Sequence, residues 1–276
     1  MVIRSLGKNS GVGYKAVWGR TGSGATPPYI AAPIAWGGNR GVFMGGWTSI
    51  EVNTIDYIDI KTLGNATDFG DTLNVVEGPA CCSNGSRGIG MAGVEQATRF
   101  DTIQYITFAT TGNSTDFGDC SAQKNACGAL SNGTRGVVGG GDAGGNFNVM
   151  EYVTIATTGN TTDFGDLTQA RERVGGLGGE TRGIFFGGNA GGTRVSTMDY
   201  ITVATTGNAT DFGDLLSDNR SNGCAGNASR VVWGGGYNGS SQVNTIQYVT
   251  TQTTGNSTDF GDLTNSRRDA GGSSGD

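Results

Sequence analysis

Histidine is absent from the 276 residues of this chain. Without imidazole there is no Ser-His-Asp or Cys-His nucleophile, no HExxH zinc motif and no histidine-ligated copper site. Catalysis would have to depend on carboxylates alone, as in glycosidases, whose two carboxylates lie about 5 to 10 Å apart. We therefore expect a protein that is not an enzyme and that holds no cofactor and no metal.

Cysteine is scarce, and long apolar runs are missing. The cysteines are odd in number and do not recur at one position of the repeat described below: Cys81, Cys82, Cys120, Cys127 and Cys224. A disulfide or zinc framework would show regular spacing, so we expect reduced side chains in a chain made in a reducing compartment. No signal-peptide run opens the chain, and no stretch reaches the ~18 apolar residues of a membrane span. The sequence predicts neither export nor membrane insertion.

Acidic residues are missing from the first 39 residues, whose basic residues are Arg4, Lys8, Lys15 and Arg20. All 24 Asp and Glu residues lie beyond them, and the net charge of the chain is -6. Binding of nucleic acid needs clustered Lys and Arg, so we expect none. We interpret residues 1–39 as a basic arm, containing Gly and Pro, that suits an acidic partner; a plain solvated tail is the alternative.

The chain does contain a repeated motif, TTGNATDFGD at residues 205–214, in five copies. Its phenylalanine recurs every 47 or 48 residues: Phe69, Phe117, Phe164, Phe212 and Phe260. So does an arginine that precedes an apolar run ending in glycines: Arg40, Arg87, Arg135, Arg182 and Arg230. Two markers with one period indicate a repeat architecture built from units of about 48 residues.

Each unit predicts four short strands. They are the apolar run after the arginine, an alternating segment such as STMDYITVAT from Ser196, the TDF of the motif, and a small-residue segment such as VGGLGG from Val174. Four such strands with their connections take about 36 to 48 residues, which is the size of one propeller blade. The small residues of the last segment suit strands that crowd a narrow axis.

We therefore predict an all-β fold, a five-bladed β-propeller of four-stranded blades over residues 40–276. Its units begin at residues 40, 87, 135, 182 and 230. Because the repeats begin at the second strand of a blade, we expect AGGSSG (residues 270–275) to pair beside residues 41–47 and to close the ring. An open solenoid with polar caps is the alternative.

A family resemblance rests on the same residues. The apolar run that ends in two glycines, the tyrosine about eleven residues later (Gly46 and Tyr57) and the arginine beside small residues resemble the kelch repeat. The resemblance covers all five units and is weaker in the second, whose run is GIGMAG from Gly88. The phenylalanine of TDFGD departs from it, because kelch units usually carry tryptophan there. Segments such as YITVATTGNATDFGDL (residues 200–215) are similar to kelch-like proteins encoded by marine tailed phages, and this resemblance implies a virion-associated protein.

Three functions stay open on this basis. The first is a non-enzymatic virion structural protein of a tail, fibre or capsid surface, made in the host cytoplasm and present in multiple copies. Its arm would contact other virion proteins, and its propeller would bind host-surface glycan or a virion protein. The second is a soluble multivalent lectin or protein-interaction propeller. The third is a carboxylate-based glycosidase or lyase.

Two sets of residues compete as the binding site. The motif repeats one Asp pair five times, for example Asp68 with Asp71, and an enzyme needs one asymmetric site; we interpret these Asp residues as backbone caps, with calcium binding as the alternative. The Asn-x-Ser/Thr of the motif is interpreted as turn chemistry. The loops after the glycines and after GDL share the other face and differ in every unit, which is typical of binding loops. The candidates there are Trp47, Phe100, Phe147, Arg194 and Tyr237.

Overall fold

The structure, a computed structural model, describes residues 39–220, 223–227 and 229–268. The chain divides into two units, Met1–Pro33 and Ile34–Asp276. The arm predicted at residues 1–39 therefore falls, except for residue 39, outside the described residues, and so do residues 270–275, which the sequence predicts to close the ring. The described residues form strands and turns, and no helix among them is long and apolar enough to span a membrane.

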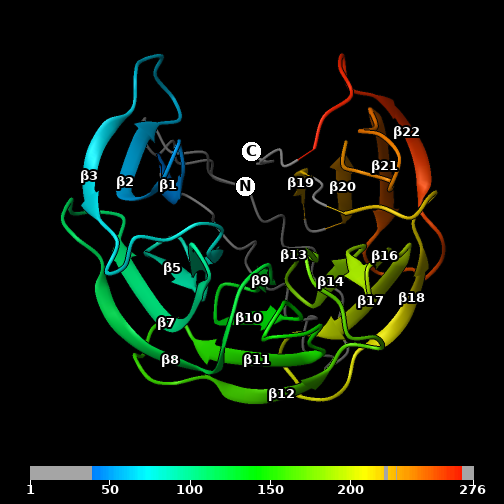
Figure 1. The fold of residues 1–276 in the computed structure, drawn as a ribbon, viewed down its shortest axis with the longest axis horizontal. Coiled ribbons are helices and arrows are strands. Elements are labelled where there is room, and N and C mark those ends of the chain that lie inside the picture. The colour runs from blue at the N-terminus through cyan, green and yellow to red at the C-terminus, as the bar shows by residue number, and fades with distance from the viewer. Residues whose placement is uncertain (1–38, 221–222, 228, 269–276) are drawn as a thin grey trace, which may run out of the picture. The chain divides into compact units, whose positions relative to one another are not determined.

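Five small antiparallel sheets stand in a ring, a five-bladed β-propeller (Figure 1). Blade 1 contains β1 (Arg40–Trp47), β2 (Glu51–Asp59) and β3 (Thr67–Asp71). Blade 2 contains β4 (Ala80–Ser83), β5 (Arg87–Met91), β7 (Thr98–Thr107) and β8 (Thr115–Lys124), with the short β6 (Val94–Glu95) against β7. Blade 3 contains β9 (Gly128–Ser131), β10 (Arg135–Gly139), β11 (Val149–Thr154) and β12 (Thr162–Asp166).

The last two blades repeat this order. Blade 4 contains β13 (Gly175–Gly178), β14 (Arg182–Phe186), β17 (Thr197–Thr202) and β18 (Thr210–Asp214), and β15 (Asn189–Ala190) pairs separately with β16 (Thr193–Arg194). Blade 5 contains β19 (Gly223–Gly226), β20 (Arg230–Gly234), β21 (Thr245–Thr250) and β22 (Thr258–Asp262). The all-β prediction and the five blades are confirmed, and a strand starts at every marker arginine.

The first strand of each complete blade lies nearest its neighbours in the ring, and TDFGD forms the outermost strand (Figure 1). Glycine is required where the inner strands meet. A Cβ added to Gly176 of β13 would lie 2.7 Å from the carbonyl oxygen of Ala129 in β9. The small residues predicted for these strands are thus explained by crowding at the axis. Blade 1 differs, because the described residues give it three strands.

The hydrophobic core lies between the blades. Each of its four clusters combines residues of two consecutive blades; the cluster of blades 3 and 4, for example, contains Val137, Phe164, Phe185 and Val203. The motif phenylalanines of blades 1 to 4 belong to these clusters and are 1–3% exposed. Phe260 of blade 5 is instead 54% exposed. The motif aromatic is therefore buried between blades in four of the five units and exposed in the fifth.

An interblade clip joins each of blades 2 to 5 to the preceding one. We use this name for the turn before TDFGD where it bonds to the TDFGD strand of the preceding blade. Its glycine N–H donates to the phenylalanine carbonyl at 2.7 Å: Gly112 to Phe69, Gly159 to Phe117, Gly207 to Phe164 and Gly255 to Phe212. Its asparagine Oδ1 accepts the N–H of the strand's last aspartate at 3.0 or 3.1 Å: Asn113 from Asp71, Asn160 from Asp119, Asn208 from Asp166 and Asn256 from Asp214.

The clip explains why the motif varies so little. A Cβ on Gly165 of β12 would lie 2.5 Å from the carbonyl carbon of Gly207, and the φ of Gly165 is +132°. Only glycine combines that backbone angle with so close an approach. The asparagine, interpreted from the sequence as turn chemistry within one blade, therefore also bonds between blades.

Each blade also stacks three side chains in the same way. The tyrosine of its long strand meets the motif phenylalanine edge to face, with ring centroids 5.8–6.0 Å apart. The marker arginine lies over that tyrosine, its Cζ 4.3–4.8 Å from the ring centroid. In blades 1 to 4 the same guanidinium donates to a carbonyl of the next blade, as Arg40 does to Phe108 at 2.6 Å. The marker arginine is therefore a structural residue.

We expect Phe212→Ala to lower the free energy of unfolding by about 3–5 kcal/mol, because the change empties a ring-sized space between blades 4 and 5. Leu216→Ala, at a side chain that is 50% exposed, should cost far less. Urea unfolding followed by circular dichroism measures both. Equal stability of Phe212→Ala and the parent would contradict the interblade position of this ring.

Candidate functional site

The variable loops of the propeller share one face with the linkers between blades. We call this the variable face; it consists of the loops after the glycines (residues 92–97, 140–148, 187–196 and 235–244) and the linkers (residues 72–79, 120–127, 167–174, 215–220 and 263–268). Backbone hydrogen bonds tie the two together, as where Gly141 N–H donates to Arg171 and Arg171 N–H donates to Phe147. The predicted segregation of constant and variable loops follows from the antiparallel order of the strands.

Three of the five candidate residues pack within or at the edge of the blades. Phe147 is half-buried, and the Lys124 ammonium lies 5.5 Å from its ring centroid. Phe100, also half-buried, is paired in register with Lys124 across β7 and β8. Trp47 ends β1 and is 61% exposed. Phe147 thus lies against a buried lysine, and Phe100 is the strand partner of that lysine. The variability of the loops, from which the candidates were chosen, does not predict either arrangement.

The structure brings the other two candidates together. The Arg194 guanidinium lies over the Tyr237 ring, 5.0 Å from its centroid. Two further guanidinium groups face the same ring, that of Arg220 at 5.6 Å and that of Arg268 at 5.3 Å. The strand pairing of Arg220 with Tyr237 holds one side of this arrangement, because the two residues bond main chain to main chain.

Positive charge accumulates around Tyr237. Partial burial lowers the pKa of Arg220, and the nearby Arg173, Arg194 and Arg268 lower it further, while Glu172 raises it. The Nε groups of Arg194 and Arg220 are buried without a hydrogen-bond partner. Neither residue takes part in the ion pairs formed among the described residues. We call Arg173, Arg194, Arg220 and Arg268, with Tyr237 among them, the arginine rim.

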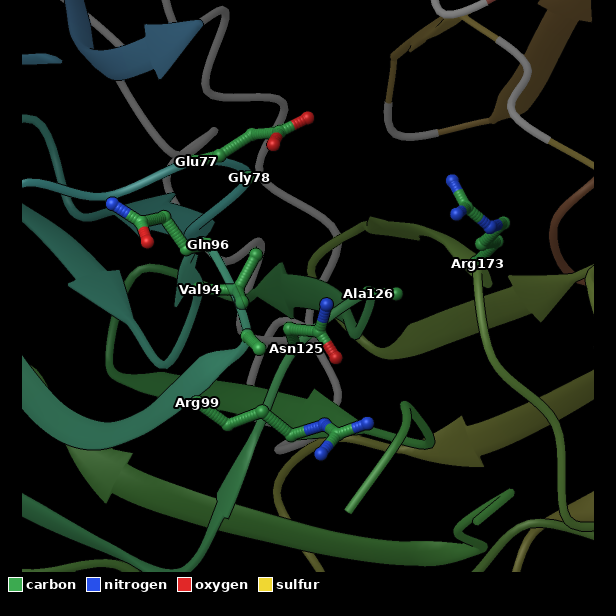
Figure 2. A pocket seen from close by; sticks show the side chains of 9 residues that line it. Glu77, Gly78, Val94, Gln96, Arg99, Asn125, Ala126 and Arg173 are labelled. Atoms are coloured by element: carbon green, nitrogen blue, oxygen red, sulfur yellow. The ribbon is translucent and has the colours of Figure 1, made fainter. Parts of the chain in front are cut away.

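A cavity of about 310 Å³ opens on the same face. Figure 2 shows Glu77 and Gln96 on one side of it and Arg173 across from them; Arg99, which is ion-paired with Asp142 at 2.6 Å, lies below. Three of its lining residues have left-handed backbones although they are not glycine: Gln96 (φ 53°), Ala126 (φ 55°) and Arg173 (φ 55°). Such strain costs of order 1–3 kcal/mol for each residue and clusters at ligand-binding positions.

Two buried ion pairs fix the linkers below this surface. Lys124 pairs with Glu151, and Arg171 pairs with Asp199 at 2.8 Å, all four side chains being 0–2% exposed. Burial raises the pKa of Glu151, but the Lys124 ammonium and hydrogen bonds from Lys124 and Ser121 outweigh it and lower that pKa overall. Because each pair joins a linker to the next blade, these charges are structural.

The repeated aspartates of the motif have structural contacts as well, and the cysteines are free thiols. Asp211 Oδ1 accepts the N–H of Gly213 at 3.2 Å, and Asp259 does the same for Gly261 at 3.3 Å, as expected of backbone caps. Among residues 39–268 outside the gaps, no group of three or more Cys, Asp and Glu side chains is placed to hold a metal ion. All five cysteines are free, and burial raises the pKa of Cys120 and Cys127 to about 12.

Lys124→Met should destabilise the fold by about 3–5 kcal/mol at pH 7, because it leaves the Glu151 carboxylate buried without a cation. The pKa of Glu151 in the folded parent lies below its ordinary value of 4.5. The ionised group therefore stabilises the fold at pH values above 4.5, and this contribution is lost as the pH falls from 4.5 through the lowered pKa. The variant keeps the hydrogen bonds from Ser121 but loses the Lys124 ammonium, so burial should raise the pKa of Glu151 relative to the parent, and the deficit should shrink as the pH falls. Urea unfolding from pH 7 to pH 4 measures the trend.

The double variant Lys124→Met/Glu151→Leu is the matched control and should recover most of the loss. A deficit of Lys124→Met that is the same at pH 7 and pH 4 would show that the missing charge is not its cause.

Comparison with known proteins adds no family: no protein-family model matches the chain, and no curated protein matches it either.

Proposed function

We propose that this chain is a non-enzymatic binding propeller that recognises an anionic ligand through the arginine rim of its variable face. The observation that carries the proposal is the pair Arg194 and Arg220, which flank Tyr237 with buried Nε groups that have no hydrogen-bond partner. A guanidinium binds carboxylate, sulfate or phosphate through paired N–H donors. An anion bound beside the two arginines would accept hydrogen bonds from the outer N–H groups of their guanidiniums and relieve the mutual repulsion of the two charges.

An acidic glycan is the ligand that fits best. Its carboxylate or sulfate groups supply the anion, and its ring supplies a surface for Tyr237. The body of the chain is acidic overall, with all 24 Asp and Glu residues beyond the arm, so it repels a long polyanion except at the rim. This contrast favours a short acidic saccharide over a nucleic acid.

We further propose that the propeller belongs to a virion, on a tail, fibre or capsid surface, made in the host cytoplasm and present in multiple copies. The support is the resemblance of the TTGNxTDFGD units to kelch-like proteins of marine tailed phages. Weak binding at one rim per chain becomes strong when many copies face one cell surface. A soluble multivalent lectin with no virion role shares the same rim and is the second candidate.

The finer features of the fold belong to this proposal. The blades are kelch-like in the double glycines of blades 1, 3, 4 and 5 and in the tyrosine of every long strand, and the ring is closed by pairing of residues 270–275 with β1. The closure is supported by blade 1, where the described residues form three strands with β1 at the edge, whereas the other blades have a further strand beside the strand that matches β1.

Arg220→Ala and Tyr237→Ala should each weaken binding of an acidic oligosaccharide at least ten-fold, since each removes one side of the anion site. Isothermal titration with a uronate oligosaccharide, its neutral counterpart and an oligonucleotide of equal charge measures this. Lys61→Ala, at an exposed lysine outside the variable face, is the matched control and should bind as the parent does. Equal affinity for the neutral sugar, or tighter binding of the oligonucleotide, would contradict the proposed ligand class.

Deletion of residues 1–39 should release the protein from virions and leave the propeller folded. The reason is that the basic arm is the segment proposed to contact acidic surfaces of other virion proteins. Quantifying the protein in purified particles, together with circular dichroism of the free fragment, checks both parts. Normal incorporation of the truncated protein would rule out the arm as the anchor.

A further inference from the structure

Blade 1 and blade 5 each have one apolar side that no blade covers in the described residues. Phe43 of β1 is 60% exposed, whereas Phe185 and Trp233, at the same strand position in blades 4 and 5, are 0% and 1% exposed. Phe260 of β22, the outermost strand of blade 5, is 54% exposed. These two sides lie at the two ends of the series of blades (Figure 1). One ordered interface is therefore missing from the ring.

The four interfaces that are present fall into charged and neutral kinds. Between blades 3 and 4, Arg171 of the linker pairs with Asp199 of the next blade; between blades 2 and 3, Lys124 pairs with Glu151.

In the other two interfaces, Val76 and Asn219 occupy the position in the linker that Lys124 and Arg171 hold. In the next blade, Gln104 and Gln247 occupy the position of the acids Glu151 and Asp199. The amide oxygen of each glutamine accepts a hydrogen bond from a linker N–H at 2.8 Å. A cation in the linker thus goes with an acid in the next blade, and a neutral linker residue goes with glutamine.

The uncovered sides of blades 5 and 1 carry, at matching positions, the same residue types that form the interface between blades 3 and 4. The linker after blade 5 holds Thr264 and Arg267 at the positions of Thr168 and Arg171. The main chain of Arg267 is held as that of Arg171 is: it accepts from Gly236 at 2.7 Å, where Arg171 accepts from Gly141 at 2.9 Å.

Blade 1 supplies the matching acid. Asp56 is paired in register with Phe43, as Asp199 is with Phe185. Thr168 bonds to Asp199 through both its N–H and its hydroxyl, which gives Thr264 the same role toward Asp56.

The apolar and turn residues match in the same way. A Cβ on Gly139 would lie 3.1 Å from Cζ of Phe185, so that glycine makes room for the ring of the next blade. Gly234 and Phe43 hold these two positions in blades 5 and 1. The turn of blade 1, LGNAT at residues 63–67, repeats TGNAT at residues 206–210, including the alanine.

We propose that blade 5 and blade 1 of the same chain form a fifth interblade interface of the blade 3–blade 4 kind, in which Arg267 pairs with Asp56. The turn at residues 63–67 forms the clip to β22, and Phe260 is buried beneath it. Phe43 fills the space left by Gly234. This inference rests on the proposed ring closure but requires only described residues.

A charge swap tests the ion pair. Asp56→Arg and Arg267→Asp should each lower the urea midpoint of unfolding, and the double variant should recover it, with a coupling of about ten-fold or more in the unfolding equilibrium constant. The matched control combines Arg267→Asp with Asp59→Arg, an exposed acid on the same strand, and should show no recovery. Additive effects of the two charge reversals would overturn the pair.

Hydrogen exchange tests the clip independently of any variant. The amides of Gly64 and Ala66 should be protected as strongly as those of Gly207 and Ala209, which donate to blade 3. Exchange at the rate of an open turn would overturn the interface. Both measurements are made at protein concentrations 100-fold apart with light scattering, because protection that appears only in dimers would assign the contact to a second copy and overturn closure within one chain.

A chain ending at Arg268 separates this inference from the proposed pairing of residues 270–275. If the coupling of Asp56 with Arg267 persists in the truncated chain, the fifth interface stands without that strand. If the full chain lacks the coupling while truncation destabilises it, the terminal residues pair with β1 and the ion pair is wrong.

Discussion

The hydrogen bond from a turn glycine of one blade to the phenylalanine carbonyl of the preceding blade is the constraint on which this propeller depends. It recurs at 2.7 Å in every clip that is present. The same turn brings an asparagine to the edge of the outer strand and covers the ring of the phenylalanine. The glycine opposite it has no room for a Cβ. Glycine, asparagine and phenylalanine are therefore fixed together, and so is their period.

Because each clip reaches only the adjacent blade, stability is approximately a sum of blade and neighbour terms. Any open series of such blades leaves one strand edge and one turn without a partner. Phe260 and the turn at residues 63–67 are those two ends. Their exposure follows from the position of their blades in the series, since the phenylalanine and the Gly-Asn-Ala-Thr of the turn are the same as in buried copies.

Near-identical blades still yield one asymmetric surface, because the clips fix one face and leave the other free to vary. Glu77, Asn125, Glu172 and Arg220 occupy one position in successive linkers, each bonded to the next blade in the same way. Only the last of them is cationic, and it faces Tyr237. The charge of the rim is thus a local property of blades 4 and 5, held on a scaffold that does not depend on it.

The sequence predicts the blades well because periodicity needs no knowledge of distant contacts. The strand starts at the marker arginines and the burial of Phe69 to Phe212 follow from spacing and residue type. The role of Asn208 does not, since its partner Asp166 is 42 residues away and any turn would use the same residue. Likewise Phe147 looks like an exposed loop aromatic until Lys124 is placed beneath it, and Arg220 joins Arg194 only through strand pairing.

Charge decides which blades can be neighbours where the backbone clips cannot. Every clip has the same donors and acceptors, so by backbone alone any blade could follow any other. Yet blade 4 placed after blade 1 would set Asp199 against Val76 and bury a carboxylate without a cation, at a cost of several kcal/mol. Blade 5 placed after blade 3 would leave Arg171 facing an amide. The buried pairs add little net stability, but losing one partner is costly, so in a chain of near-copies they penalise contacts between blades that do not follow each other in the chain.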